Sequence, residues 1–136
     1  KNEVIPSTKF SNPLKNFYFS YVKRQDPYSI EAVEDLLKKF KNNVSLIKGN
    51  SNNVLKKIDM SQINYVFLDG GHDYSTVLND LNCCKEVINN NGTVLCDDYD
   101  LSYAPGVKQA IKDFISENNF KCSIICNDRF AKIENS

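Results

Sequence analysis

The sequence predicts an α/β fold, built from a mostly parallel sheet with helices on both faces and a C-terminal antiparallel hairpin. Two observations lead to this prediction. Helix-like and strand-like segments alternate from residue 29 onward, which is typical of parallel strands joined by crossover helices. In addition, the runs "YVFL" (65–68) and "TVLC" (93–96) are continuously apolar, as expected for strands that are covered on both faces.

Apolar residues at helical spacing predict three main helices, over residues 29–40, 75–88 and 107–117. Ser29 is expected to cap the first helix, because a serine side chain can accept a hydrogen bond from a free N–H group of the first turn. Pro105 and Gly106 precede the third helix, as proline often does at a helix start. A shorter helix is expected around residues 53–58.

Strands are predicted at residues 44–47, 63–69 and 93–96, where short apolar runs end in turn residues. The C-terminal stretch "FKCSIICNDRFAKIE" predicts two further strands joined by a tight turn at Asn127-Asp128. These last two strands would form the antiparallel hairpin.

Residues 1–28 differ from the rest of the chain, since they hold three prolines around the aromatic run "NFYFSYV" (16–22). We predict an irregular N-terminal segment there, mostly loop with one short strand. Residues 29–136 would then form a single, partial α/β domain, which suits a chain of 136 residues.

Composition excludes several classes of function. Lysine and arginine balance aspartate and glutamate at 17 each, so no global field attracts nucleic acid or a membrane surface. We find neither an apolar run of membrane-spanning length nor a signal-peptide core, so a soluble, cytoplasmic protein is expected. The five cysteines form no CxxC pair and are expected to be reduced, without a zinc site. A homo-oligomer is compatible with the sequence.

Polar residues follow three of the predicted strands, in "GNS" (49–51), "DGGHDY" (69–74) and "DDYD" (97–100). Ligands of α/β sheets bind at the carboxyl ends of the strands. If the strands end level, Asp69 comes close to Asp97 and Asp98, and three carboxylates there must share protons or hold a cation. Oxygen ligands suit magnesium, with manganese or calcium as alternatives.

A structural interpretation competes with this site, because aspartates after strands often cap helices or form turns. We assign Asp73 and Asp100 to that structural class. His72, the only histidine, is either a surface or packing residue or a general base that reaches a substrate hydroxyl. Gly70 and Gly71 are turn residues, or give a ligand room beside the backbone.

Four stretches carry a resemblance to a known family: "VSLIKGNSNNVL", "INYVFLDGGHDYSTVLNDL", "NNGTVLCDDYD" and "PGVKQAIKDF". In this order and at these separations they resemble the C-terminal two-thirds of a class I S-adenosylmethionine-dependent methyltransferase with a Rossmann-like fold. The most similar group is the metal-dependent O-methyltransferases that include the macrocin and mycinamicin sugar enzymes. The resemblance covers about residues 30–133.

The resemblance implies roles for individual residues. Asp69, Asp97 and Asp98 would be the metal ligands, and His72 the catalytic base. Candidates for binding the cofactor S-adenosylmethionine are Asn50, Ser51, Asp69 and Gly70. The implied reaction is Mg²⁺-assisted transfer of a methyl group to a hydroxyl of a small substrate such as a sugar.

One expected part of the family pattern has no counterpart here. The first strand and its glycine-rich cofactor loop should precede residue 30, yet no glycine precedes Gly49. Either these parts lie upstream in a longer chain, or the domain is a degenerate relative that binds a partner or small ligand without catalysis. Metal-dependent hydrolases and phosphoacceptor receiver domains also carry acid clusters, although the receiver lysine has no counterpart.

Overall fold

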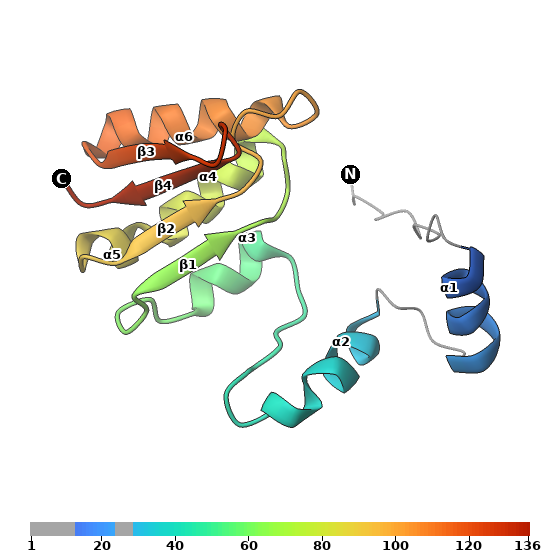
Figure 1. Cartoon of the computed structure of the whole chain (residues 1–136). Coiled ribbons are helices and arrows are strands. Elements are labelled where there is room, and N and C mark those ends of the chain that lie inside the picture. Colours follow the sequence, from blue (N-terminus) through green and yellow to red (C-terminus); the bar gives the residue numbers. More distant parts are fainter. Residues whose placement is uncertain (1–12, 24–28) are drawn as a thin grey trace. The chain divides into compact units, whose positions relative to one another are not determined.

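The computed structural model describes residues 13–23 and 29–136 (Figure 1). The chain divides into two compact units, residues 1–48 and 49–136, and each unit is described by itself. The domain boundary predicted after residue 28 stays a prediction, and residues 1–12 and 24–28 of the predicted irregular segment lie outside the described residues.

The aromatic run near the N-terminus is helical. Helix α1 (Pro13–Phe17) continues into the π-helix η1 (Tyr18–Lys23), so the described residues 13–23 do not hold the short strand predicted in this segment. The rings of Phe17 and Tyr21 stack with centroids 5.0 Å apart. Helical winding brings residues four positions apart into contact, whereas a strand would separate them by about 13 Å.

The predicted helix after Ser29 is confirmed as α2 (Ile30–Leu37), followed by the 3₁₀ helix η2 (Lys38–Phe40). Ser29 Oγ accepts a hydrogen bond from Ala32 N at 3.2 Å, which confirms the predicted cap. Residues 44–48 have no regular secondary structure, so the strand predicted at 44–47 is wrong. A strand needs a neighbouring backbone to pair with, and no described segment pairs with these residues.

The second unit contains a four-stranded sheet with the strand order β1-β2-β4-β3. Strands β1 (Tyr65–Leu68) and β2 (Thr93–Cys96) are parallel. Strand β4 (Phe130–Glu134) is antiparallel both to β2 and to β3 (Lys121–Ile125). The predicted α/β class and C-terminal hairpin are therefore confirmed. The prediction of a mostly parallel sheet is wrong for the described strands, because β1 with β2 is their one parallel pair and the other two pairs are antiparallel.

Five helical segments accompany the sheet: α3 (Ser51–Val54), η3 (Leu55–Lys57), α4 (Tyr74–Cys83), α5 (Lys85–Asn89) and α6 (Pro105–Asn118). The helix predicted over 75–88 is divided at Cys84 into α4 and α5. Helices α4, α5 and α6 lie on the same side of the sheet (Figure 1), so these three helices depart from the prediction of helices on both faces. α4 and α6 pack directly against each other.

The hydrophobic core lies between these helices and one face of the sheet. The sheet contributes Val94, Cys96, Ala131 and Ile133, and the helices contribute fully buried residues such as Leu81, Ile111 and Phe114. Each large apolar side chain buried in this way stabilises the fold by about 2 kcal/mol.

The opposite face of β1 is open. Tyr65 and Phe67 are 56% and 47% exposed, because successive side chains of a strand point to opposite faces. The expectation that this strand is buried on both faces is therefore wrong. β1 is also an edge strand of the described sheet, so its outer backbone groups have no strand partner among the described residues.

All five cysteines are free thiols, as predicted. Burial raises the pKa of the Cys84 and Cys96 thiols to about 12, so both act as small apolar core residues. Among residues 13–23 and 29–136, no helix has the length and apolar content required to cross a lipid bilayer.

We expect Asp73→Ala to lower the free energy of unfolding by about 1 kcal/mol at neutral pH. Asp73 caps α4, since its Oδ1 accepts hydrogen bonds from Thr76 N at 3.0 Å and from Ser75 Oγ at 2.7 Å. These bonds lower its pKa from 3.8 to about 2. The stabilisation is therefore present above pH 3.8 and is lost as the pH falls toward 2.

Urea denaturation of the chain and the variant at pH 7 and at pH 2 measures this difference. Asp73→Asn serves as the control, because its amide oxygen can still accept the capping bonds. Equal stability of Asp73→Ala and the original chain at pH 7 would show that the cap contributes nothing.

Candidate functional site

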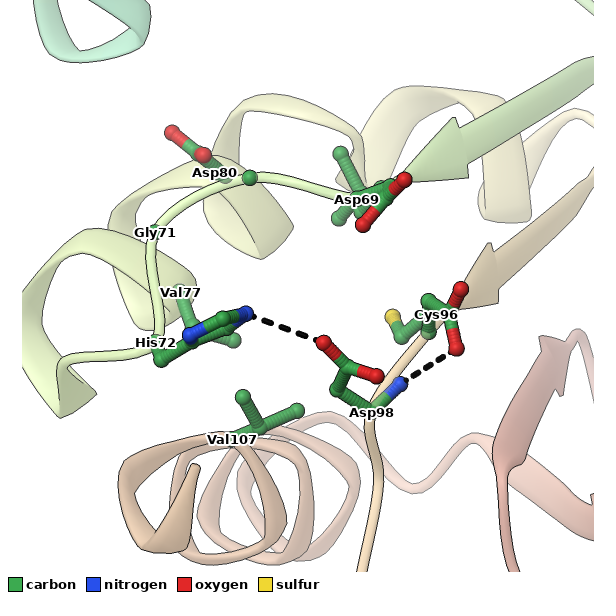
Figure 2. A pocket seen from close by; sticks show the side chains of 11 residues that line it. Asp69, Gly71, His72, Val77, Asp80, Cys96, Asp98 and Val107 are labelled. Atoms are coloured by element: carbon green, nitrogen blue, oxygen red, sulfur yellow. Dashed lines mark hydrogen bonds and ion pairs between the residues drawn. The ribbon is translucent and has the colours of Figure 1, made fainter. Parts of the chain in front are cut away.

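A small pocket lies beyond the carboxyl ends of β1 and β2 (Figure 2). It is lined by Leu68, Asp69, Gly70, Gly71, His72, Val77, Asp80, Cys96, Asp97, Asp98 and Val107. Most of the residues that the sequence predicts for a site therefore line one hollow. Asn50 and Ser51 do not line it.

The parallel pairing of β1 with β2 brings the acidic residues to the same edge. Leu68 lies opposite Cys96 in the register, and Asp97 N donates to Leu68 O at 2.9 Å. Asp69 and Asp97 are the next residues on their strands, so both leave the sheet at the same level, as the sequence predicts.

Gly106 at the start of α6 supports the turn that carries His72. A Cβ atom at Gly106 would lie 2.5 Å from His72 O and 2.5 Å from Tyr74 N, well inside contact distance. The missing side chain allows α6 to pack directly on the backbone of residues 72–74. The position of His72 therefore depends on a glycine 34 residues away in the sequence.

His72 and Asp98 face each other across the pocket (Figure 2). His72 Nε2 lies 3.0 Å from Asp98 Oδ2, with 40% of the histidine side chain exposed and 12% of the aspartate. The other oxygen, Asp98 Oδ1, accepts a hydrogen bond from the Tyr103 hydroxyl at 3.1 Å. The Tyr103 ring also contacts the imidazole edge-on, with centroids 5.6 Å apart. Both carboxylate oxygens of Asp98 are thus engaged.

Asp97 forms a two-point ion pair with Arg129. Arg129 Nε lies 2.8 Å from Asp97 Oδ1, and Nη2 lies 2.9 Å from Oδ2. Oδ1 also accepts a hydrogen bond from Asp98 N at 2.7 Å. The Arg129 guanidinium holds the pKa of the Asp97 carboxyl below its usual range, so this acid is ionised at neutral pH.

Asp80 is a buried acid that the sequence did not single out. It projects from α4 behind the Gly70-Gly71 turn, on the side away from His72 (Figure 2). Burial raises the pKa of its carboxyl, and a hydrogen bond with the Ser51 side chain partly opposes that effect. Asp80 therefore links α4 to the start of α3, next to the residues predicted on the cofactor side.

The predicted cofactor residues differ in what they can offer a ligand. Asn50 Oδ1 already accepts from Asn52 N at 2.9 Å as the cap of α3, and Ser51 is hydrogen-bonded to Asp80. Asp69 is exposed and makes no hydrogen bond or ion pair within the described part of the chain. Gly70 is open, since an added Cβ would meet only Asp80 Oδ2, at 3.9 Å.

The three predicted metal ligands line the same pocket but do not form a ligand cluster. Among the described residues, no group of three His, Cys, Asp or Glu side chains is arranged to hold a metal ion. Asp97 is paired with Arg129, and Asp98 with His72 and Tyr103. Asp69 alone has an unengaged carboxylate, so the arrangement does not fit a divalent cation.

Besides Asp80, the sequence analysis missed two residues that contact the acids of the site, Arg129 and Tyr103. Arg129 lies in the hairpin turn, and it reaches the acids because β4 pairs with β2 in a register that sets Cys96 opposite Ala131. Long-range pairing of this kind leaves no local signal. Tyr103 lies in the stretch "LSYAPG", where an aromatic residue near paired acids was the one available indication.

Comparison with known proteins gives consistent results. The chain matches the model of a family described as a methyltransferase domain over residues 13–99, which is more than half of its length. It is 34% identical over 56 residues to an uncharacterized protein of Acanthamoeba polyphaga mimivirus, and the match covers 40% of this chain and 25% of that protein.

A solved structure, the O-methyltransferase NovP, resembles the fold with a TM-score of 0.63 at 16% identity. The match covers 97% of this chain but 56% of NovP. The chain therefore spans about half the length of that structure and a quarter of the viral protein.

We expect Gly106→Ala to destabilise the chain by about 2 kcal/mol and to displace the His72 turn, because the added methyl group would overlap backbone atoms. Denaturant unfolding measures the first effect. A change in the NMR chemical shifts of the His72 ring protons measures the displacement of the turn. Gly70→Ala is the control, since its Cβ would make only an ordinary contact, with Asp80 Oδ2 at 3.9 Å. Equal effects of both substitutions would contradict the close packing at Gly106.

Proposed function

This chain belongs to the methyltransferase-domain family, and we propose that the protein transfers a methyl group from S-adenosylmethionine to a hydroxyl of a small substrate such as a sugar. His72 acts as the general base. Because the chain spans part of its relatives' length, this activity is proposed for the complete protein.

The single observation that carries the proposal is the pairing of His72 with Asp98 at the pocket. His72 Nε2 lies 3.0 Å from Asp98 Oδ2, so an Nε2–H group can donate a hydrogen bond to this carboxylate oxygen. The lone pair of Nδ1 then remains available to a substrate. A carboxylate that fixes one imidazole nitrogen and leaves the other as base is a recurrent catalytic arrangement.

The proton of the acceptor hydroxyl would pass to His72 Nδ1 as the oxygen attacks. Asp98 would stabilise the resulting imidazolium, and Tyr103 would hold the other oxygen of Asp98 in place. A partly exposed imidazole suits this role, since 40% of the His72 side chain is accessible. Once bound, S-adenosylmethionine supplies a methyl group on a positively charged sulfur, which departs as a neutral thioether.

Part of the predicted cofactor set fits S-adenosylmethionine. The unengaged Asp69 carboxylate can accept hydrogen bonds from hydroxyl or amino groups, and Gly70 leaves room for a ligand to approach the backbone. The side-chain oxygen of Asn50 already accepts the hydrogen bond that caps α3, and the Ser51 side chain interacts with Asp80. We therefore propose Asp69 and Gly70 as the principal cofactor contacts of this chain.

The resemblance implies that Asp69, Asp97 and Asp98 bind a Mg²⁺ ion that assists the reaction, and this role of Mg²⁺ stays a prediction. Mg²⁺ requires several free oxygen donors in near-octahedral geometry. The ion pairs of Asp97 and Asp98 occupy those donors here, and no step of the proposed reaction is assigned to a metal.

We expect His72→Gln to lower the rate of methyl transfer by the complete protein about 10²-fold or more, through loss of the base. Asp98→Asn should lower it as well, because the amide cannot stabilise the imidazolium. Release of S-adenosylhomocysteine with a panel of sugars measures both effects. Asp100→Asn is the control, since that acid pairs with Lys108 outside the pocket; full activity of His72→Gln would contradict the assignment.

Asp69→Asn should weaken binding of S-adenosylmethionine to the complete protein about tenfold, because a charged hydrogen-bond acceptor is lost. Isothermal titration calorimetry measures the change, with Asp73→Asn as a matched acid four residues away. An unchanged dissociation constant in Asp69→Asn would remove this residue from the cofactor site.

A further inference from the structure

Arg129 is held at the site by more than its side chain. Its carbonyl oxygen accepts a hydrogen bond from Tyr99 N at 2.8 Å, and its N–H donates to Cys126 O. The preceding turn residues 126–128 all have positive φ, between 54° and 64°. The guanidinium also lies 5.1 Å from the Phe130 ring centroid. The hairpin thus delivers a positive charge to the end of β2 in a fixed position.

The Arg129 guanidinium pairs with the Asp97 carboxylate, which the sequence predicts to be a ligand of a divalent cation. The Asp97 side chain is 7% exposed, and each of its oxygens bonds one guanidinium nitrogen, at 2.8 and 2.9 Å. A planar two-point match of this kind is the strongest geometry between arginine and a carboxylate. A metal ion at Asp97 would have to displace it.

We propose that the Arg129 guanidinium takes the place of the divalent cation at this site. The protein then excludes metal ions from Asp97 and uses the positive charge of its own arginine instead. The guanidinium neutralises Asp97 next to Asp98 and so relieves the repulsion between adjacent acids. Two of its five N–H groups bond Asp97, and 56% of the side chain is exposed.

Titration with Mn²⁺, followed by the electron paramagnetic resonance signal of the free ion, tests this proposal directly. The original chain should bind Mn²⁺ no more tightly than about 1 mM. Arg129→Ala uncovers Asp97 beside Asp69, and should tighten binding about tenfold or more. The double variant Arg129→Ala, Asp97→Asn should return to the weak value.

Lys132→Ala is the matched control, because it also removes one positive charge, here from the adjoining strand β4, where Lys132 pairs with Glu134. If it tightens Mn²⁺ binding as much as Arg129→Ala does, the effect is one of overall charge and the proposal fails. It also fails if folded Arg129→Ala, checked by circular dichroism, binds Mn²⁺ no better than the original chain.

The original chain alone gives a decisive result even if Arg129→Ala does not fold. Binding of Mn²⁺ tighter than about 0.1 mM that Asp97→Asn weakens would overturn the proposal, since metal would then enter beside Arg129. These measurements do not depend on the proposed methyl transfer. If methyl transfer is absent but the Mn²⁺ results are as expected, the proposed function fails while the inference about Arg129 stands.

Discussion

The hydrogen bonding of β2 on both of its edges is the constraint on which the site depends. On one edge, the parallel pairing with β1 sets Leu68 opposite Cys96 and brings the turn with His72 to the end of β2. On the other edge, the antiparallel pairing with β4 sets Ala131 opposite Cys96 and brings Arg129 to the same point. A shift of one residue in either register would turn every side chain of that strand to the other face of the sheet and separate the partners.

The site then follows from how several negative charges are accommodated in a small space. The sequence indicates that Asp69, Asp97 and Asp98 repel one another, and a bound cation is one solution. The chain uses a different solution, in which Asp97 and Asp98 each have their own partner. Arg129 pairs with Asp97, and His72 and Tyr103 pair with Asp98. Asp69 remains exposed, where water screens its charge.

Features set by local sequence could be predicted. The limits of β2 match the apolar run "TVLC", and α6 begins at Pro105, two residues before the predicted start at Val107. The convergence of Asp69, His72, Asp97 and Asp98 also follows from local reasoning, because the ends of neighbouring parallel strands share one edge.

Features set by long-range pairing could not be predicted. The apolar run 44–47 resembles a strand, yet a strand forms only where another backbone pairs with it. Residues 16–22 are rich in β-favouring aromatic residues but form a helix, in which Phe17 and Tyr21 stack. The contact between Arg129 and Asp97 spans 32 residues of sequence. The packing of Gly106 on His72 likewise depends on how α6 lies against the turn.

The backbone conformation of Asp98 determines where two acids of the site point. Asp98 has a φ of 59°, in the left-handed region that favours glycine, at a cost of about 1 kcal/mol for a residue with a side chain. Glycine would remove that strain, but it would also remove the carboxylate that bonds His72 and Tyr103. The left-handed turn sends Asp97 toward Arg129 and Asp98 toward His72, so two consecutive acids meet different partners. Strain retained at a residue that bonds the only histidine favours a functional role for this turn over a purely structural one.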